Sequence, residues 1–255
     1  MLSRRLFIGL GAAFVTGFAR PALPRLAQAR PADSQAGRLR SRPRGYAAAA
    51  PRPGLQRLGL EAGRDGFLYV PPGYRHGAGS PLVVLFHGAG QRADLWQAML
   101  PVADDLGLVL LAPESRRATW DRILGSFGAD VAFIDDALGH AFGRCSIDPA
   151  RIAFAGFSDG ASYALTIGLT NGDFVTDIIA LSPGFMDPAF LRGKPRVFVA
   201  HGTGDRILPV ATTSRRIVPR LRELGYRVVY EEFEGGHRIV PEISARALAA
   251  FVGRA

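Results

Sequence analysis

The sequence predicts an α/β fold in which a mostly parallel central sheet is covered by helices on both faces. From residue 58 onward, short apolar runs alternate with longer segments of helical periodicity. Strands that are apolar along their whole length are typical of parallel sheets, because helices cover both faces of such a sheet. The chain has 255 residues, of which 48% are hydrophobic, so it can bury one large core. We therefore expect one folded domain over residues 58–255.

The apolar runs predict seven strands and the helical patterns predict five helices. The expected strands cover 66–70 (GFLYV), 81–86 (PLVVLF), 106–112 (LGLVLLA), 151–155 (RIAFA), 177–182 (DIIALS), 196–200 (RVFVA) and 226–233 (YRVVYEEF). The expected helices cover 94–105, 129–142, 158–170, 211–224 and 241–252. In sheets of this kind, functional residues gather beyond the carboxyl ends of the strands.

Residues 1–29 have the features of an export signal. Residues 3–7 (SRRLF) place paired arginines before an apolar run that is short for a membrane span, and residues 27–29 (AQA) offer a small-x-small cleavage site. This pattern resembles a twin-arginine signal, so we expect the export machinery to bind the leader. The expected mature protein is periplasmic or secreted and has no stable membrane anchor. An uncleaved N-terminal anchor is the alternative.

Residues 30–57 are dense in Arg, Pro, Ala and Gly, which predicts a mobile linker. A cationic arm that binds anionic envelope polymers is the alternative. The net charge of +9 comes from this end of the chain, because residues 1–57 contain eleven Arg and one acidic residue, whereas residues 58–255 contain 20 basic and 21 acidic residues. Nucleic-acid binding needs a clustered basic face on the folded domain, so we expect no nucleic-acid partner.

The pentapeptide GFSDG, residues 156–160, stands between the apolar run 151–155 and an Ala-rich segment of helical character. A strand that leads directly into a helix must reverse direction within a few residues, and glycines there avoid Cβ clashes. This geometry lifts Ser158 out of the sheet as a nucleophile elbow. A glycine-rich turn whose serine only caps the next helix is the alternative.

Three further polar motifs follow predicted strands. They are HGAGQ at 87–91, HGTGD at 201–205 and EGGH at 234–237. A serine hydroxyl becomes a good nucleophile when a histidine takes its proton, and the histidine needs a carboxylate that fixes its tautomer. Ser158, Asp205 and His237 supply these three roles at three strand ends.

Residues 64–255 resemble an α/β-hydrolase, because they combine the elbow, the His-Gly loop and the chain order Ser, Asp, His. Within that superfamily the chain resembles the compact carboxylesterases of the phospholipase/carboxylesterase type. It is also similar to secreted polyhydroxybutyrate depolymerases and feruloyl esterases. The further motifs that carry this likeness are YVPPGY (69–74), DVAFIDDAL (130–138) and SIDPARIAFAGFSDG (146–160).

The resemblance implies hydrolysis of carboxylic esters through an acyl-enzyme intermediate, with no metal and no organic cofactor. The backbone N–H groups of Ala89 and Asp159 would form the oxyanion hole. Depolymerases and feruloyl esterases often carry a cysteine beside the His-Gly pair and an asparagine after the nucleophile. This chain has Ala89 and Asp159 at those places, which argues against a polymer substrate.

Other residues could fill two of the catalytic roles. Glu234 or Asp187 could serve as the acid, with Asp205 as a turn residue, but Asp205 follows the penultimate strand, as the fold requires. Among the histidines, His237 fits best as the base, because it lies in a Gly-Gly-His turn before the last helix. The others occupy a polar loop, a predicted helix or turns that look structural, and they are His76, His140, His87 and His201.

The size of the substrate depends on the loops around the site. Trp120 could line the acyl or alcohol pocket, with core packing or loop anchoring as the alternative. Residues 113–128 form the largest irregular stretch near the site, and no long insertion could form a lid. We therefore expect an open, shallow site for short or medium acyl esters. A serine peptidase or polyester depolymerase on the same fold, and a non-catalytic binding protein, are the alternatives.

Overall fold

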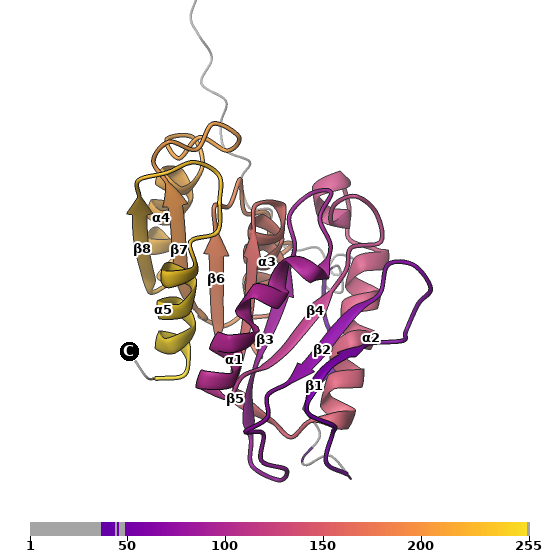
Figure 1. Cartoon of the computed structure of the whole chain (residues 1–255). Coiled ribbons are helices and arrows are strands. Elements are labelled where there is room, and N and C mark those ends of the chain that lie inside the picture. The colour runs from indigo at the N-terminus through magenta and orange to yellow at the C-terminus, as the bar shows by residue number, and fades with distance from the viewer. Residues whose placement is uncertain (1–36, 44, 46–48, 254–255) are drawn as a thin grey trace, which may run out of the picture.

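The computed structural model describes residues 37–43, 45 and 49–253, which form one eight-stranded sheet between two layers of helices (Figure 1). The predicted export signal, residues 1–29, lies outside the described residues and stays a prediction. The strands are β1 Gly54–Arg57, β2 Gly66–Val70, β3 Ser80–Phe86, β4 Val109–Pro113, β5 Ile147–Phe157, β6 Asp177–Leu181, β7 Arg196–Gly202 and β8 Val228–Phe233. The helices are α1 Leu100–Leu106, α2 Ala129–Arg144, α3 Asp159–Thr170, α4 Ser214–Glu223 and α5 Pro241–Phe251.

The strands lie in the order β1-β2-β4-β3-β5-β6-β7-β8. All neighbours from β4 to β8 pair in parallel, and β1 and β2 add an antiparallel edge. The carboxyl ends of the parallel strands therefore meet at one edge of the sheet (Figure 1). This arrangement confirms the predicted α/β-hydrolase fold.

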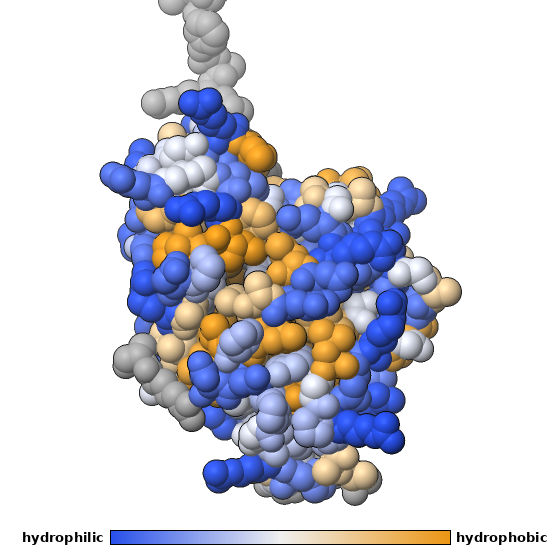
Figure 2. Space-filling view, viewed as in Figure 1, coloured by the Kyte–Doolittle hydropathy of each residue, from blue (hydrophilic) through white to orange (hydrophobic). Residues whose placement is uncertain are grey.

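The two faces of the sheet carry separate apolar cores. In β3, Leu82 and Val84 belong to the core under α2, α3 and α4, whereas Val83 and Leu85 belong to the core under α1 and α5. Alternate side chains of a strand point to opposite faces, so a continuously apolar strand fits only between two helical layers. Figure 2 views the face of α1 and α5 and shows apolar side chains gathered over its middle, with hydrophilic ones toward its edges.

Several predicted boundaries differ from the structure, and two of the differences follow from proline and glycine positions. The helix expected over 94–105 is a 3₁₀ helix, Ala93–Met99, followed by α1, which has a proline in its first turn. Proline fits a helix start, because its missing N–H has no partner there in any case. Gly107 ends α1 with a left-handed φ of 66°, so β4 begins at Val109 and not at residue 106.

The prediction of a mobile linker over residues 30–57 is wrong for many of the residues that the structure describes in this range. Residues 54–57 form β1, which pairs with β2 at the sheet edge. Residues 37–42, here called the N-terminal strap, lie against α2 and the end of α3. The folded domain therefore begins before residue 58. A four-residue edge strand and a strap with one apolar anchor have no periodicity that a sequence pattern could detect.

The strap is held by specific contacts. Leu39 is 1% exposed and belongs to the core, and its N–H donates to Asn171 Oδ1 at 2.9 Å. The Arg38 guanidinium donates to both oxygens of the Asp173 carboxylate, at 2.7 and 2.6 Å. The Asp135 carboxylate accepts two backbone N–H groups of the strap. A bidentate pair of this kind fixes geometry as well as charge.

Replacing Leu39 with alanine is expected to lower the free energy of unfolding by about 2–3 kcal/mol, because it removes a buried side chain that the strap alone supplies. The matched control is Leu55→Ala in β1, where the side chain is 42% exposed and the expected change is within about 0.5 kcal/mol. Urea unfolding followed by tryptophan fluorescence measures both. Equal stability of Leu39→Ala and the wild type would contradict the docked strap.

Among the residues that the structure describes, no helix combines the length and the apolar character needed to cross a bilayer.

Candidate active site

Ser158 occupies a sharp turn between β5, which ends at Phe157, and α3, which begins at Asp159. Its backbone has φ 58° and ψ −123°, a conformation that a residue with a side chain rarely adopts. The Ser158 N–H donates to Leu181 O at 2.9 Å, which ties the turn to the end of β6. The Ser158 side chain makes no capping hydrogen bond to α3, so the alternative of a helix cap is wrong.

The glycines of the pentapeptide are required by close backbone contacts. A Cβ on Gly156 would lie 2.2 Å from Gly160 O, and a Cβ on Gly160 would lie 2.0 Å from Phe86 O. No side chain can be accommodated at either distance, since both obstacles are backbone atoms. The spacing Gly-x-Ser-x-Gly therefore lets α3 start directly against β3 and β5, with the serine at the turn between the glycines.

The structure brings together Ser158, His237 and Asp205. His237 Nε2 lies 2.8 Å from Ser158 Oγ, and His237 Nδ1 lies 2.6 Å from Asp205 Oδ2. The His237 ring also packs against the Phe157 ring, with centroids 4.7 Å apart. The three side chains come from the turn after β5, the loop after β7 and the loop after β8. They meet because these strands all end at the same edge of the sheet.

The Asp205 side chain is wholly buried, but its carboxylate accepts several hydrogen bonds. Its Oδ1 accepts the backbone N–H groups of Ile207 and Leu208, at 2.9 and 2.8 Å. Burial alone would raise the pKa of Asp205, but the donors from Leu208, His237 and Ile207 outweigh it and hold the pKa below its usual range. The carboxylate is therefore ionised. It fixes the proton of His237 on Nδ1 and leaves Nε2 free to accept the proton of Ser158.

The rival residues lie elsewhere. Asp187 pairs with Arg122 at 2.5 Å, and Glu234 is exposed to solvent. Of the other histidines, His76 is exposed and His140 lies in α2. Asp205 and His237 are thus the carboxylate and the imidazole that the geometry places beside Ser158.

The loop after β3, residues 87–91, runs alongside the serine. A Cβ on Gly88 would lie 3.3 Å from Ser158 Cβ. The Gly88 N–H donates to Gln91 Oε1 at 3.0 Å, and the Gly90 N–H donates to Ala118 O at 2.7 Å. The N–H of Ala89, between these two, has no acceptor in the described part of the chain.

The N–H of Asp159 is unpaired in the same way. As the first residue of α3 it has no acceptor within the helix, and no other described residue supplies one. The Asp159 carboxylate accepts a hydrogen bond from Thr119 Oγ1 at 2.7 Å. Among the described residues, Ala89 and Asp159, which the sequence nominates for an oxyanion hole, therefore both keep an amide without an acceptor, one in the loop after β3 and one directly after Ser158.

His87 stabilises the loop after β3. It is wholly buried; its Nδ1 donates to Gly88 O at 2.8 Å, and its Nε2 accepts the Ser115 N–H at 3.0 Å. Burial is the main reason why the pKa of His87 falls to about 4, so the ring is neutral. The Arg64 guanidinium joins the same group by donating to Gln91 O at 3.0 Å.

Trp120 does not line a pocket. Its side chain is 0% exposed, its Nε1 donates to His87 O at 2.9 Å, and its ring stacks on Tyr163 with centroids 4.9 Å apart. The prediction of a substrate contact is therefore wrong, and the alternative of loop anchoring is correct. The physical reason is that the only polar atom of the ring is used to hold the loop after β3.

Two apolar residues close to Asp205, Ile207 and Leu208, are not singled out by the sequence motifs. Ile207 is 69% exposed although it lies two residues after Asp205. Leu208 lies next to Gly184, where a Cβ would be 3.2 Å from Leu208 Cδ2. An exposed isoleucine at the sheet edge that carries the site offers apolar surface to a substrate. In the sequence, the only signal for this apolar surface is the pair Ile207 and Leu208 shortly after HGTGD.

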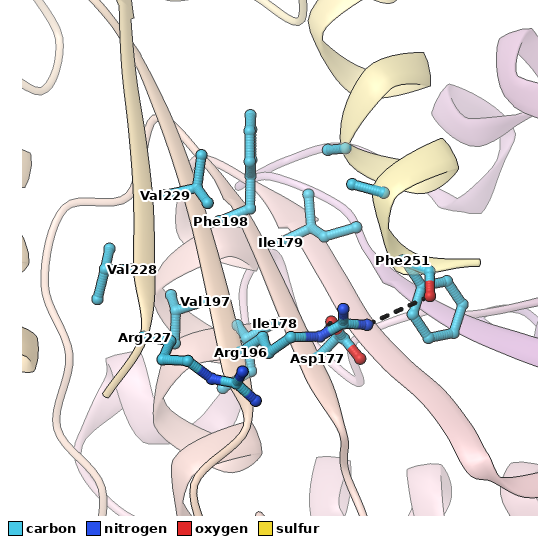
Figure 3. Close-up of a pocket in the computed structure, with 12 residues that line it drawn as sticks. Asp177, Ile178, Ile179, Arg196, Val197, Phe198, Arg227, Val228, Val229 and Phe251 are labelled. Carbon is cyan, nitrogen blue, oxygen red and sulfur yellow. Dashed lines mark hydrogen bonds and ion pairs between the residues drawn. The ribbon is translucent and has the colours of Figure 1, made fainter. Parts of the chain in front are cut away.

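A groove of about 280 Å³ lies elsewhere, beside α5 (Figure 3). It is lined by the first residues of β6, β7 and β8, among them Phe198 and Val229, and at its rim Arg196 donates to Phe251 O at 3.3 Å. Since these strands are parallel, the groove lies away from their carboxyl ends and from Ser158. Among the described residues, no cluster of three or more His, Cys, Asp or Glu side chains is placed to hold a metal ion.

Comparisons with known proteins agree with this fold. Residues 106–252, more than half of the chain, match the model of a family described as Phospholipase/Carboxylesterase. No curated protein sequence matches the chain.

Solved esterases share the fold. The structure of esterase PE8 has a TM-score of 0.60 and 24% identity, over 74% of this chain and 97% of that one. A butyrate-bound thermophilic esterase from the Planctomycetes species Thermogutta terrifontis has a TM-score of 0.60 and 18% identity, over 78% and 92%. A ferulic acid esterase from Anaeromyces mucronatus, in complex with ferulic acid, has a TM-score of 0.59 and 15% identity, over 80% and 91%.

Proposed function

Because the chain belongs to the phospholipase/carboxylesterase family and is a carboxylic ester hydrolase, we propose that it cleaves short or medium acyl esters through Ser158, His237 and Asp205. One observation carries the proposal: the continuous contact from Ser158 Oγ through His237 to the buried Asp205 carboxylate. A serine, a histidine and an ionised carboxylate in this geometry form the catalytic unit of acyl transfer.

In the first half of the reaction, His237 Nε2 takes the proton of Ser158 while Oγ attacks the ester carbonyl carbon. The carbonyl oxygen becomes an oxyanion, which the free N–H groups of Ala89 and Asp159 stabilise. The C–O bond to the alcohol then breaks, and His237 gives the proton to the departing alkoxide. The acyl group remains on Ser158.

In the second half, a water molecule repeats the sequence. His237 Nε2 takes a proton from the water as its oxygen attacks the acyl carbonyl, and the oxyanion forms again between the two amides. The bond to Ser158 Oγ breaks, the proton returns to Oγ and the carboxylic acid leaves. Asp205 stays ionised throughout and stabilises the imidazolium that forms in each half.

The oxyanion hole contributes through fixed donors. Loss of one such donor typically costs about 3 kcal/mol in the transition state. The N–H of Asp159 lies at the start of α3, where the helix dipole also favours negative charge. The N–H of Ala89 is fixed because its neighbours Gly88 and Gly90 are each held by a hydrogen bond.

The proposed acyl size rests on the surroundings of the site. Ile207 lies beside the acid with most of its side chain exposed, which gives the acyl or alcohol chain an open apolar surface and not a deep tunnel. The segment 113–128 is held in place by the buried Trp120, whose Nε1 donates to His87 O. The esterase from Thermogutta terrifontis, which shares the fold, is bound to butyrate, a carboxylate of the chain length proposed here.

A p-nitrophenyl ester series from acetate to palmitate tests this assignment. The expected result is the highest kcat/KM for short or medium chains and a steep fall toward palmitate, because long chains find no enclosing apolar surface. A clear optimum at palmitate would contradict the open site. Feruloyl esters, hydroxybutyrate oligomers and peptide anilides extend the series. Preferred turnover of one of these would favour the corresponding alternative, a feruloyl esterase, a depolymerase or a peptidase.

A further inference from the structure

A second histidine lies against Asp205. His201, near the end of β7, is 0% exposed, and its Nε2 lies 2.7 Å from Leu208 O and 3.2 Å from Asp205 Oδ2. Its Nδ1 lies 2.7 Å from Ser214 Oγ, at the start of α4. These contacts use both ring nitrogens, so His201 is not available as the proton acceptor of Ser158.

The partners fix the tautomer of His201. A carbonyl oxygen only accepts, so Nε2 carries the proton and donates it to Leu208 O. The hydroxyl of Ser214 then donates to Nδ1. Burial lowers the pKa of His201 and keeps the ring neutral. His201 therefore presents a fixed N–H edge both to the carbonyl of Leu208 and to the carboxylate of Asp205.

Leu208 connects the two contacts. Its N–H donates to Asp205 Oδ1 at 2.8 Å, and its carbonyl accepts from His201. His201 thus holds the turn that supplies donors to one oxygen of Asp205, and its Nε2 lies near the other oxygen. Rotation of the carboxylate away from His237 would break contacts on both sides.

We infer that His201 is a positioning residue, which holds the Asp205 carboxylate toward His237 Nδ1 and is itself oriented by Ser214. The inference rests on the proposed function, in which Asp205 orients the base. Three observations support the inference: the His201 ring is buried, it donates to the carbonyl of Leu208, and it lies beside the Asp205 carboxylate, which the Leu208 N–H also contacts. His201 acts through Asp205 and does not touch the reacting atoms.

The direct test replaces His201 with alanine. The expected result is a fall in kcat of about 10- to 100-fold, the effect of losing a hydrogen bond at a charged group, with KM within about twofold. His201→Gln, which keeps an N–H donor on a side chain of similar length, should recover most of the loss. If the alanine variant does not fold, the glutamine variant and Ser214→Ala carry the test, with losses of kcat smaller than about 10-fold but measurable.

His140→Ala is the matched control. His140 is a partly buried histidine in α2 whose Nε2 has no hydrogen-bond partner within the described ranges. This control should keep kcat within about twofold of the wild type. An equal fall in kcat for His140→Ala and His201→Ala would overturn the inference, because it would reflect a general effect of removing a buried ring.

A double-mutant cycle separates positioning from a structural role. In an Asp205→Asn background, His201→Ala should change kcat by less than about twofold, because the carboxylate that His201 positions is already lost. An equal factor in both backgrounds would overturn the inference while leaving the triad intact. Wild-type turnover of Asp205→Asn alone would instead overturn the proposed function, so the two failures are distinguishable.

Discussion

Replacing Ser158 with alanine is expected to reduce kcat for p-nitrophenyl butyrate by about a million-fold. Ser158 Oγ is the hydroxyl that His237 Nε2 contacts, so the variant has no nucleophile that the base can activate. Binding and the oxyanion amides remain, which leaves an acceleration of about a thousand- to ten-thousand-fold over the reaction in water. The side chain of Ser158 makes no capping bond to α3, so the free energy of unfolding should change by less than about 0.5 kcal/mol.

Initial rates with an ester substrate and a urea unfolding curve measure the two effects on one preparation. Ser182→Ala is the matched control, because it removes a buried serine hydroxyl that has no hydrogen-bond partner among the residues described. This control should keep kcat within about threefold of the wild type. Near-wild-type turnover in Ser158→Ala would show that another group attacks the ester.

Replacing Asp205 with asparagine should lower kcat by about ten-thousand-fold and leave the fold intact. An asparagine has the same shape, and its carbonyl can still accept the N–H groups of Ile207 and Leu208. Its amide donates a proton toward His237 Nδ1, however, and so favours the tautomer whose Nε2 is protonated. That nitrogen can no longer accept the proton of Ser158.

Glu234→Gln is the control for the choice of acid. Glu234 is exposed, and its substitution should change kcat by less than about twofold. The near-ultraviolet circular dichroism of Asp205→Asn should match that of the wild type. If Asp205→Asn turned over normally and Glu234→Gln were inactive, the acid would have to be Glu234.

The local part of the site could be predicted from the sequence because it is determined by spacing. Glycines at 156 and 160 flank one serine between a strand and a helix, and the structure shows why both positions exclude a Cβ. Asp205 and His237 were found because each follows a predicted strand, and parallel strands bring their carboxyl ends together. Seven of the eight strands of the described part could be predicted, because each contains a short apolar run.

The features that the sequence did not predict depend on contacts between distant segments. Leu39 enters the core beside Asn171, and nothing near residue 39 in the sequence indicates this partner. The burial of Trp120 follows from its hydrogen bond to His87 O, which lies 33 residues away. The sequence pattern places His201 at a structural turn, and its contact with Asp205 forms only because the loop after β7 folds back on the ring.

The central claim is that Ser158 is the nucleophile of an ester hydrolase. Its most direct test is a fluorophosphonate probe, followed by mass spectrometry of the digested protein, because such probes react covalently with a serine that a neighbouring histidine activates. The expected result is a single adduct on the peptide that contains Ser158, formed slowly in Asp205→Asn and absent in Ser158→Ala. An adduct on a different residue, or no adduct on the folded wild-type protein, would contradict the claim.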